Sequence, residues 1–536
     1  MLPILRESTE GAGSALHSAG WREASRVPPE ILALFPYEEH PYNLALVLEV
    51  ARVCGIEPLF ALKSMAENVV PDIGVLKTYA PVVGTHGRSL AFSNGCSANE
   101  RHGCTGNWTR LGFDAHDPDG EPGLWVSAFV NNRADRTARS QVFSRVMVSD
   151  IAVDRHFLVG SNLTGLMGFY GEAVEEYVAL VDLWQPIDAD AGDAATALSL
   201  APSRTNDVLG AARARLDKHF RHARLATSGA NVRAELGVML LAIGLPESAS
   251  SPLLEAWSVP EEIAKALATR GLLATVVEGV VGPLRARVEQ WKAHNEFLGA
   301  LPRVGAGIGG ATGADAVGLN ERLREFLRKA FHAKIVVLDE SVQGDGDALV
   351  EALLRHVPPG FHERLMGVQN IKGPGLTLIY RLEVATEAAR QLRALAMGGL
   401  RFQVHQALTR LAALPDVPLF ARASLQAELD HIVSHFRSFD AEESTLLDIF
   451  RSRLGDADAA KRAGDALEPA LRRGLGRRAY EASGFEAAGS ILREFFEPLA
   501  AIARRVKSDR VYRGLADGRL SPERAARALR VLIDGA

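Results

Sequence analysis

The sequence predicts an α/β fold in the front part of the chain and a mainly helical structure behind it. Two short apolar runs, 125–132 (WVSAFVNN) and 155–160 (RHFLVG), each end in polar residues, as buried parallel strands do. A helical pattern over 136–148 lies between them, so the three pieces form a βαβ unit. After about residue 190, apolar residues recur mostly at helical spacing.

The segments ahead of the βαβ unit are expected to be two helices followed by short strands. Apolar residues at helical spacing predict a helix over 40–56, which ends near Gly55. A second helix over 57–68 stops before Pro71, because the residue ahead of a proline disfavours the helical conformation. Residues 77–92 then hold short β-like pieces.

The chain behind the βαβ unit is expected to form a series of helices with one α/β interruption. The helices cover 206–226, 232–245, 260–297, 319–332, 387–413, 425–453 and the tail to 536. Pro283 is expected to kink or split the third of these. Over 333–386, a strand (333–341), a helix (348–357) and a strand (376–386) predict a small α/β unit of its own. The Gly- and Ala-rich segment 305–313 predicts a linker.

The composition is ordinary for a soluble globular protein of 536 residues, with 47% hydrophobic and 23% charged residues. A net charge of −5 gives no sign of nucleic-acid binding, which usually needs a basic face. Three cysteines are too few for a disulfide framework, so a reducing, cytoplasmic compartment is expected. The first residues lack the apolar region of a signal peptide, and no apolar run approaches the ~20 residues of a membrane span. Any membrane association would therefore come through partners.

An ordered series of motifs carries the strongest functional signal. They are 35–43 (FPYEEHPYN), 71–74 (PDIG), 94–105 (NGCSANERHGCT), 130–140 (VNNRADRTARS) and 160–165 (GSNLTG). In order and spacing this series resembles the ligase subunit of poly-γ-glutamate synthase, a branch of the Mur ligase family. The resemblance covers roughly residues 30–170.

The resemblance implies a division of the chain and a reaction. Residues 1–75 would be the helical tail of a central ATPase domain, and 76–190 a Rossmann-like C-terminal domain. The helical region 191–332, the α/β unit 333–386 and the helical region 387–536 lie outside the resemblance. The implied activity is ATP- and Mg²⁺-dependent amide formation, in which a carboxylate becomes an acyl-phosphate and an amine then displaces phosphate.

Arg133, Asp135, Arg136 and Arg139 form the most chemically specific group. The strand 125–132 delivers them to its polar end, and arginine binds carboxylates through a bidentate fork. A ligase that adds glutamate must hold carboxylates, and the resemblance places these residues in the loop that binds the incoming amino acid. The alternative is a set of ion pairs at a helix start, with Asp135 near the helix N-terminus.

The other candidate residues come from the resemblance. It places Asn94 and Asn99 in a loop that faces the active site on domain closure, the alternative being a polar turn. His40 and Asn43 share one face of a helix start, and the resemblance assigns this helix a contact with adenine or ribose, the alternative being a capping or a buried polar pair. In the hinge 71–74, Gly74 is expected to supply an unusual backbone angle.

The phosphate-binding loop of such a ligase is missing, because no G-x-x-x-x-G-K-[ST] motif occurs. The expected partners are therefore a separate P-loop ATPase half or membrane synthase subunits, with a glutamate-like amino acid as substrate. A truncated start and a domain that has lost catalysis remain open. No catalytic residue is assigned and no metal site is expected. The other hypothesis is a non-catalytic scaffold or regulatory subunit of a capsule or polymer synthesis complex, with residues 191–536 as its assembly platform.

Overall fold

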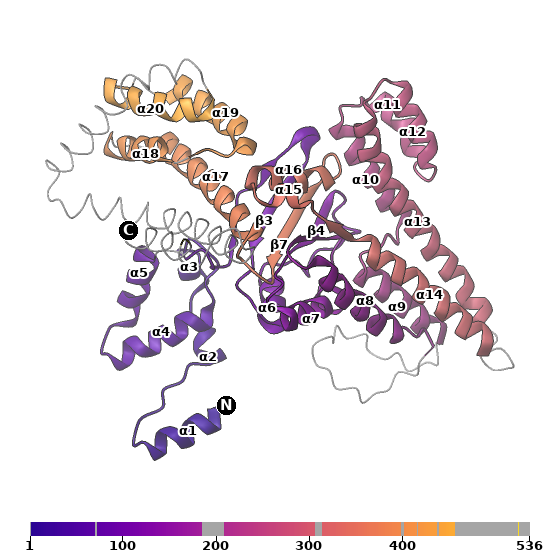
Figure 1. The fold of residues 1–536 in the computed structure, drawn as a ribbon, viewed down its shortest axis with the longest axis horizontal. Coiled ribbons are helices and arrows are strands. Elements are labelled where there is room, and N and C mark those ends of the chain that lie inside the picture. The colour runs from indigo at the N-terminus through magenta and orange to yellow at the C-terminus, as the bar shows by residue number, and fades with distance from the viewer. Residues whose placement is uncertain are drawn as a thin grey trace.

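The structure is a computed structural model that describes residues 2–69, 72–184, 208–305, 313–397, 401–414, 416–436, 439–455 and 524. A β-sheet lies at the centre and groups of helices extend from it to either side (Figure 1). The expected linker at 305–313 and the expected helical tail to 536 lie almost entirely outside the described residues. None of the described helices combines the length and the apolar character that a bilayer crossing requires.

One sheet of seven strands organises the front of the chain. The strands are β1 (Lys77–Thr78), β2 (Val82–Val83), β3 (Ser89–Asn94), β4 (Leu124–Asn132), β5 (Arg155–Gly160), β6 (Ile335–Val337) and β7 (His362–Val368). Their order is β1-β3-β7-β4-β5-β6, with β2 also paired to β3. β1 and β2 run antiparallel to β3, and the other pairs are parallel. The predicted βαβ unit is confirmed, because β4 pairs with β5 and α7 (Thr137–Arg145) connects them.

The centre of the sheet contains a strand that the sequence did not reveal. β7 lies between β3 and β4, and His362 is aligned with Ser89 on one side and Leu124 on the other. The strand begins with His362, Glu363 and Arg364, so no continuous apolar run marks it. Residues 333–386 were expected to form an α/β unit of their own. Their strands β6 and β7 instead join the sheet of residues 77–160.

The strand expected over 376–386 is wrong, because these residues begin α17 (Pro374–Met397). Apolar residues are so dense here that Leu376, Leu378 and Leu382 fit a period of two as well as a helix. Pro374 suits the first turn of a helix. The beginning of α17 packs into the core beside the sheet, and its later part packs into the core of a helical bundle.

Two hydrophobic cores cover opposite faces of the sheet. The helices α6 (Arg101–Arg110), α7, α8 (Leu163–Ala179) and α14 (Gly313–Ala333) enclose one core with Val130 of β4. The helices α16 (Gly346–His356) and α17 enclose the other with Phe129. Along the chain, the strands β3, β4, β5 and β6 follow one another in one direction across the sheet, and β7 then returns to the place between β3 and β4. Because crossovers are right-handed, the outward and return connections place their helices on opposite faces.

The remaining helices form three groups and a short connection. The amino-terminal group is α1 (Leu2–Gly11), α2 (Trp21–Ala24), α3 (Pro29–Leu32), α4 (Pro41–Val53) and α5 (Pro58–Asn68). The second group is α9 (Val208–His222), α10 (Gly229–Ala242), α11 (Glu247–Glu255), α12 (Pro260–Thr269) and α13 (Ala274–Gly305). The third joins the end of α17 to α18 (Arg401–Ala413), α19 (Leu419–Phe436) and α20 (Ala441–Leu454), and α15 (Glu340–Gln343) precedes α16.

The helix does not split at Pro283, which was one of the two outcomes expected there, and the other outcome, a kink, stays a prediction. Pro283 is inside α13, whereas the chain turns between α12 and α13 at Gly271. Gly271 has a φ of +78°, the left-handed conformation that commonly ends a helix. The glycine therefore sets the boundary that the proline was expected to set.

Candidate functional site

Polar side chains gather where β4, β7 and β5 end, at the carboxyl edge of the sheet. β4 ends in Asn131–Asn132, Gln369–Asn370 follow β7, and Ser161–Asn162 follow β5. In open parallel sheets, ligands bind outside this edge at the point where neighbouring strands lead to opposite faces. β4 leads to α7 on one face and β7 leads to α17 on the other. The candidate site therefore lies between the ends of these two strands.

Asn132 links three of the loops at this edge. Its Oδ1 accepts hydrogen bonds from Gln369 Nε2 and from Ser140 Oγ, both at 2.7 Å. Its Nδ2 donates to the carbonyl oxygen of Ser161 at 2.8 Å. Asn132 and Gln369 are both fully buried, so these hydrogen bonds are shielded from water. Asn132 therefore fixes the relative positions of the loops after β4, β5 and β7.

Asn131 and Asn370 attach the end of β4 to the start of α17. Asn131 Nδ2 donates to the carbonyl oxygens of Asn370 at 2.8 Å and Lys372 at 2.7 Å. In return, Asn370 Nδ2 donates to the carbonyl oxygen of Asn131 at 3.0 Å. A Cβ on Gly375 would lie 2.8 Å from Asn131 Nδ2, so a larger residue would disturb this approach.

Arg133, Asp135 and Arg136 stand on the solvent side of this network. Arg133 donates from Nε and Nη2 to the two carboxylate oxygens of Asp135, at 3.0 and 2.7 Å. Arg136 Nε lies 3.7 Å from Asp135, and the Arg136 side chain is 51% exposed. The ion pairs expected at the helix start are present. The Arg133 guanidinium thus has the bidentate geometry in which arginine binds carboxylates, and here it binds the carboxylate of Asp135.

Arg139 bridges to the loop after β7. Its Nη1 donates to Asn370 Oδ1 at 2.5 Å and to the carbonyl oxygen of Gln369 at 3.3 Å. Burial lowers the pKa of Arg139, and the positive charges of Arg136 and Arg133 lower it further. Three guanidinium groups therefore share one edge of the sheet, with the Asp135 carboxylate as the neighbouring negative charge. An anion bound here would reduce their mutual repulsion.

Asn94 and Asn99, the other two candidates for substrate binding, differ in their surroundings. Asn94 is 1% exposed, and its Nδ2 donates to the carbonyl oxygen of Ile73 at 2.8 Å, which holds the hinge against the end of β3. Asn99 is exposed. The unusual backbone angle expected at Gly74 is wrong, because its φ is not positive. A Cβ there would lie 2.7 Å from Ser97 Oγ, so close approach explains the glycine.

His40 and Asn43 make local contacts at the start of α4. His40 Nδ1 accepts the backbone N–H of Tyr42 at 3.2 Å, and Asn43 Nδ2 donates to Glu39 Oε1 at 2.9 Å. Arg110 of α6 donates to the carbonyl oxygen of Glu39 at 3.0 Å, which attaches this helix start to the α/β part. Burial and then the charge of Arg110 lower the pKa of His40. The capping arrangement is present, and a nucleotide contact stays a prediction.

Gln369 and Asn370 were not among the residues predicted from the sequence. Their signal is the order V-Q-N at 368–370, which repeats the V-N-N of 130–132 at the end of β4. Because the strand before them was not recognised, the polar pair had no place in a sheet. Gln369 also has a φ of +77°, a strained backbone conformation of the kind that clusters at functional sites.

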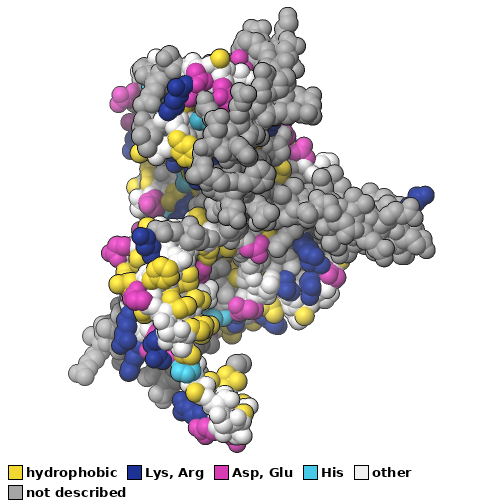
Figure 2. Space-filling view, turned by 90° about the vertical axis from the view of Figure 1, so that its left-hand side faces the viewer, with side chains coloured by type: hydrophobic (Ala, Val, Ile, Leu, Met, Phe, Trp, Pro, Cys, Tyr) yellow, Lys and Arg dark blue, Asp and Glu magenta, His cyan; other side chains and the backbone are white. Residues whose placement is uncertain are grey.

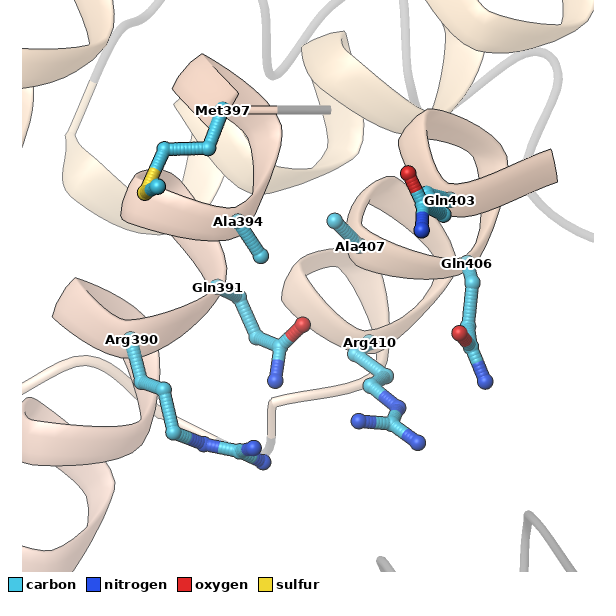
Figure 3. Close-up of a pocket in the computed structure, with 8 residues that line it drawn as sticks. All are labelled: Arg390, Gln391, Ala394, Met397, Gln403, Gln406, Ala407 and Arg410. Carbon is cyan, nitrogen blue, oxygen red and sulfur yellow. The ribbon is translucent and has the colours of Figure 1, made fainter. Parts of the chain in front are cut away.

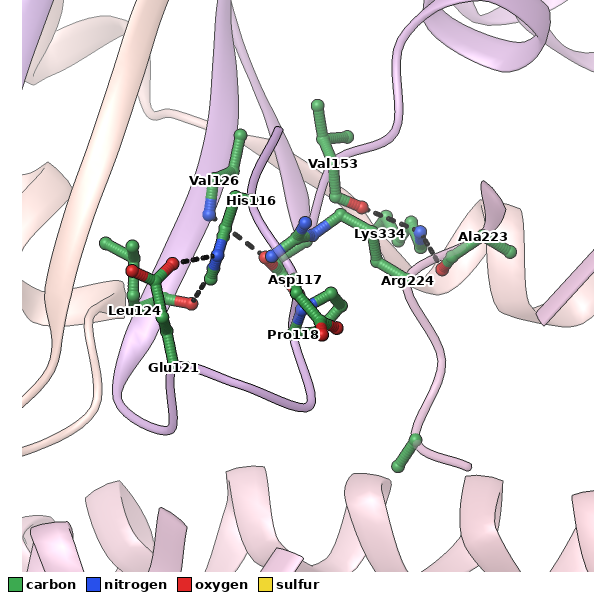
Figure 4. Close-up of polar contacts among 12 residues, drawn as sticks. His116, Asp117, Pro118, Glu121, Leu124, Val126, Val153, Ala223, Arg224 and Lys334 are labelled. Atoms are coloured by element: carbon green, nitrogen blue, oxygen red, sulfur yellow. Dashed lines mark hydrogen bonds and ion pairs between the residues drawn. The ribbon is translucent and has the colours of Figure 1, made fainter. Parts of the chain in front are cut away.

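A second polar cluster lies at the amino ends of the strands. Asp154 accepts hydrogen bonds from Arg224 Nε at 2.7 Å and from Arg287 Nη2 at 3.0 Å. Burial opposes ionisation of Asp154, but the two arginines outweigh it and lower its pKa to about 2. Lys334 Nζ donates to the backbone carbonyl oxygens of Val153 and Ala223 (Figure 4). These contacts attach α9 and α13 to the sheet.

A pocket of about 300 Å³ lies between α17 and α18 (Figure 3). It is lined by Arg390, Gln391, Ala394, Met397, Gln403, Gln406, Ala407 and Arg410. It lies at the end of α17 that is remote from the carboxyl edge of the sheet, so it is separate from the candidate site. Within the described ranges, no group of three His, Cys, Asp or Glu side chains is placed to hold a metal ion.

Comparisons with known proteins concern the front of the chain. Residues 79–232 match a family model described as the poly-gamma-glutamate synthase CapB C-terminal domain. PGA synthase CapB of Bacillus subtilis (strain 168) is 30% identical over 154 residues, which are 28% of this chain and 36% of that protein. Capsule biosynthesis protein CapB of Bacillus anthracis is 29% identical over 136 residues, 25% of this chain and 28% of that protein. No solved structure matches the chain significantly.

The chain thus spans about a third of the length of these curated relatives. The matched residues contain β3, β4 and β5 together with Arg133, Arg136 and Arg139. The part of the chain that builds one side of the candidate site is therefore similar, at low identity, to the CapB C-terminal domain of poly-gamma-glutamate synthase.

Proposed function

We propose that this chain is the amino-acid-binding part of an ATP-dependent γ-glutamyl amide ligase, and that a partner supplies the phosphate loop. The observation that carries the proposal is the bidentate hydrogen bonding of the Arg133 guanidinium to the Asp135 carboxylate, beside the carboxyl ends of β4 and β7. The similarity of residues 79–232 to a poly-gamma-glutamate synthase domain supports it.

The proposed reaction has two steps. A substrate carboxylate attacks the γ-phosphorus of ATP, which releases ADP and forms an acyl-phosphate. The amine of the incoming amino acid then attacks the acyl carbon, phosphate leaves, and the nitrogen loses a proton as the amide forms. Arg133 would exchange the Asp135 carboxylate for a carboxylate of the incoming amino acid. Arg136, which is half exposed and only loosely paired, would add a second positive charge.

The nucleotide enters this proposal through the resemblance. Asn43 is exposed, and its side-chain amide donates a hydrogen bond to the flexible side chain of Glu39. The amide could therefore rotate and contact an adenine or ribose group. His40 would lie beside it. The sequence has no phosphate-loop motif, and the described residues offer no cluster for Mg²⁺. The proposal therefore places the phosphates and the ion on the partner, and membrane synthase subunits would be further partners.

The test is reconstitution of the full chain with a polypeptide that carries a phosphate loop. ADP release that depends on glutamate is expected only from the mixture. Arg133→Ala should raise the KM for glutamate at least about tenfold, because it removes a charge-assisted bidentate contact. The control is Arg145→Ala, which breaks a comparable exposed ion pair with Glu176 and should not change the KM. An inactive mixture, or an unchanged KM in Arg133→Ala, would contradict the proposal.

The alternative is a non-catalytic scaffold or regulatory subunit of a capsule-polymer complex. The extended groups of helices outside the sheet favour it, since such surfaces serve assembly (Figure 1). On this alternative, the partner's ADP release is independent of Arg133, so the same two variants decide between the functions.

A further inference from the structure

The pocket between α17 and α18 is a hollow in the helical bundle, away from the sheet. Its volume is about 300 Å³, at the lower end of the range for small-molecule sites. Ala394 of α17 and Ala407 of α18 line it, and their short side chains leave the space between the two helices. Leu392 and Leu408, on neighbouring faces of the same helices, are fully buried in the core of the bundle. The hollow is therefore not a gap in that core.

Basic side chains from both helices meet at one end of the pocket. The lining residues recur at helical spacing, over 390–397 on α17 and over 403–410 on α18. Figure 3 shows the guanidinium groups of Arg390 and Arg410 at one end of the pocket. Met397 and Gln403 lie at the other end. Two guanidinium groups that converge from two helices are suited to bind a carboxylate.

The surroundings of Arg390 show how a carboxylate is bound at this end. Arg390 donates from Nε and Nη2 to the two carboxylate oxygens of Glu387, at 2.8 and 2.7 Å. Gln391 Nε2 donates to Glu387 Oε1 at 2.6 Å. The Arg390 side chain is 59% exposed, so a carboxylate that arrives from solvent can reach its guanidinium group.

Amide groups line much of the remaining wall. Gln391, Gln403 and Gln406 each offer N–H donors and a carbonyl acceptor, which are also the groups of a chain amide. Met397 is 86% exposed, so the pocket is open to solvent at its other end and a long chain can pass out of it. The lining thus fits a ligand that combines carboxylates, amides and short aliphatic spacers.

We propose that this pocket binds a segment of an acidic polyamide, a chain whose every unit has one carboxylate, one amide and a short aliphatic spacer. The choice of γ-linked glutamate as this chain rests on the proposed function, because that chain would be the product. Its carboxylate lies between Arg390 and Arg410, and its amides form hydrogen bonds with Gln391 and Gln406. The bundle thereby holds the chain at a distance from the edge of the sheet where the amide bond forms.

A local site is needed to hold such a chain, because the protein as a whole does not attract it. The net charge is −5, and Figure 2 shows acidic and basic side chains interspersed on one side of the molecule. Long-range attraction of a polyanion is therefore weak, and the paired guanidinium groups supply the attraction instead. Binding should weaken as the salt concentration rises.

The test is calorimetric titration of the full chain with a γ-linked pentamer of glutamate, without ATP, free glutamate or a partner polypeptide. Free glutamate has carboxylates but no amide, and inorganic phosphate has charge alone. Both are titrated in parallel. The pentamer is expected to bind at least about tenfold more tightly than either.

Two variants change the pocket in different ways. Arg390→Gln removes a charge, whereas Ala394→Leu fills the hollow and leaves every charge in place. Both positions are exposed and both new residues favour helices, so circular dichroism should match that of the wild type. Each variant should raise the Kd for the pentamer at least about tenfold. The control is Arg393→Gln, which removes the same charge from an exposed position of α17 outside the pocket and should leave the Kd unchanged.

The inference is overturned if the pentamer does not bind, if both variants retain binding, or if Arg393→Gln loses it equally. Equal affinity for phosphate or free glutamate would reduce the pocket to a general anion site and overturn it as well. Binding that Arg133→Ala loses and Arg390→Gln retains would place the chain at the edge of the sheet, against this inference and in favour of the proposed function. Binding in the pocket without Arg133-dependent ligation would leave this inference standing and refute the proposed function.

Discussion

Glu363 places a carboxyl group in the middle of the sheet, and Glu363→Gln should remove a pH-dependent loss of stability. The side chain is 0% exposed, and burial raises its pKa from 4.5 to about 7, against smaller opposing effects of Ser127 and Arg155. The folded protein therefore keeps a proton that the unfolded chain releases. Stability should fall as the pH rises from about 4.5 to about 7 and stay lower above that. At about 1.4 kcal/mol per pKa unit, the loss is roughly 3 kcal/mol.

The assay is urea unfolding, followed by circular dichroism at about pH 5 and about pH 8. The free energy of unfolding lost between the two pH values should be smaller by roughly 2.5 kcal/mol in Glu363→Gln than in the wild type, since part of the total loss has already occurred at about pH 5. The control Glu351→Gln changes an exposed residue of α16 and should follow the wild type. Other groups, such as Lys334, whose pKa burial lowers to about 7, cancel in the comparison between variants. Equal losses in all three proteins would refute the reasoning.

Three further substitutions test the packing around the sheet. Asp154→Asn should lower the free energy of unfolding by ~3–5 kcal/mol, because it leaves two buried arginines without their counter-charge; a loss below ~1 kcal/mol in urea unfolding would speak against this. Gly160→Ala should prevent stable folding, since Gly160 has a φ of +99° and the new Cβ would lie 2.0 Å from the Asn132 carbonyl oxygen. A soluble variant with the near-ultraviolet circular dichroism of the wild type would disprove this prediction. Asn132→Ala should lose ~1–3 kcal/mol, because it removes the 2.7 Å hydrogen bond of Gln369 and leaves that side chain only the 3.4 Å contact with Ser140 Oγ. It should also speed hydrogen exchange in the loop after β7, and unchanged exchange would show that Asn132 does not hold that loop.

Local patterns were enough to predict the elements that the chain builds from adjacent residues. The helices α4 and α5 and the strands β4 and β5 lie where their apolar spacing places them. The position of Arg133 at the carboxyl edge followed from the same pattern, because a parallel strand carries its last residues to that edge. Each of these predictions depends on a few residues in sequence.

The partners of those elements could not be predicted in the same way. β7 begins with charged residues, and Glu363 is buried because β3 and β4 flank it, which no local pattern reveals. α17 was mistaken for a strand because the apolar residues at its start, which pack into the core beside the sheet, fit a period of two as well as a helix. The contribution of Gln369 and Asn370 to the site followed from β7 and was missed with it. What the sequence lacked was the pairing of distant segments.

The place of β7 also sets the order in which the protein can be completed on the ribosome. β3 and β4 leave the exit tunnel early, yet the strand that joins them starts at residue 362. At ~5–20 residues per second it follows on the order of ten to fifty seconds later. During that interval two apolar strand edges have no neighbour, which is the condition that chaperones relieve. By the same reasoning, a fragment that stops at residue 232, where the family match ends, would lack the strand between its own halves.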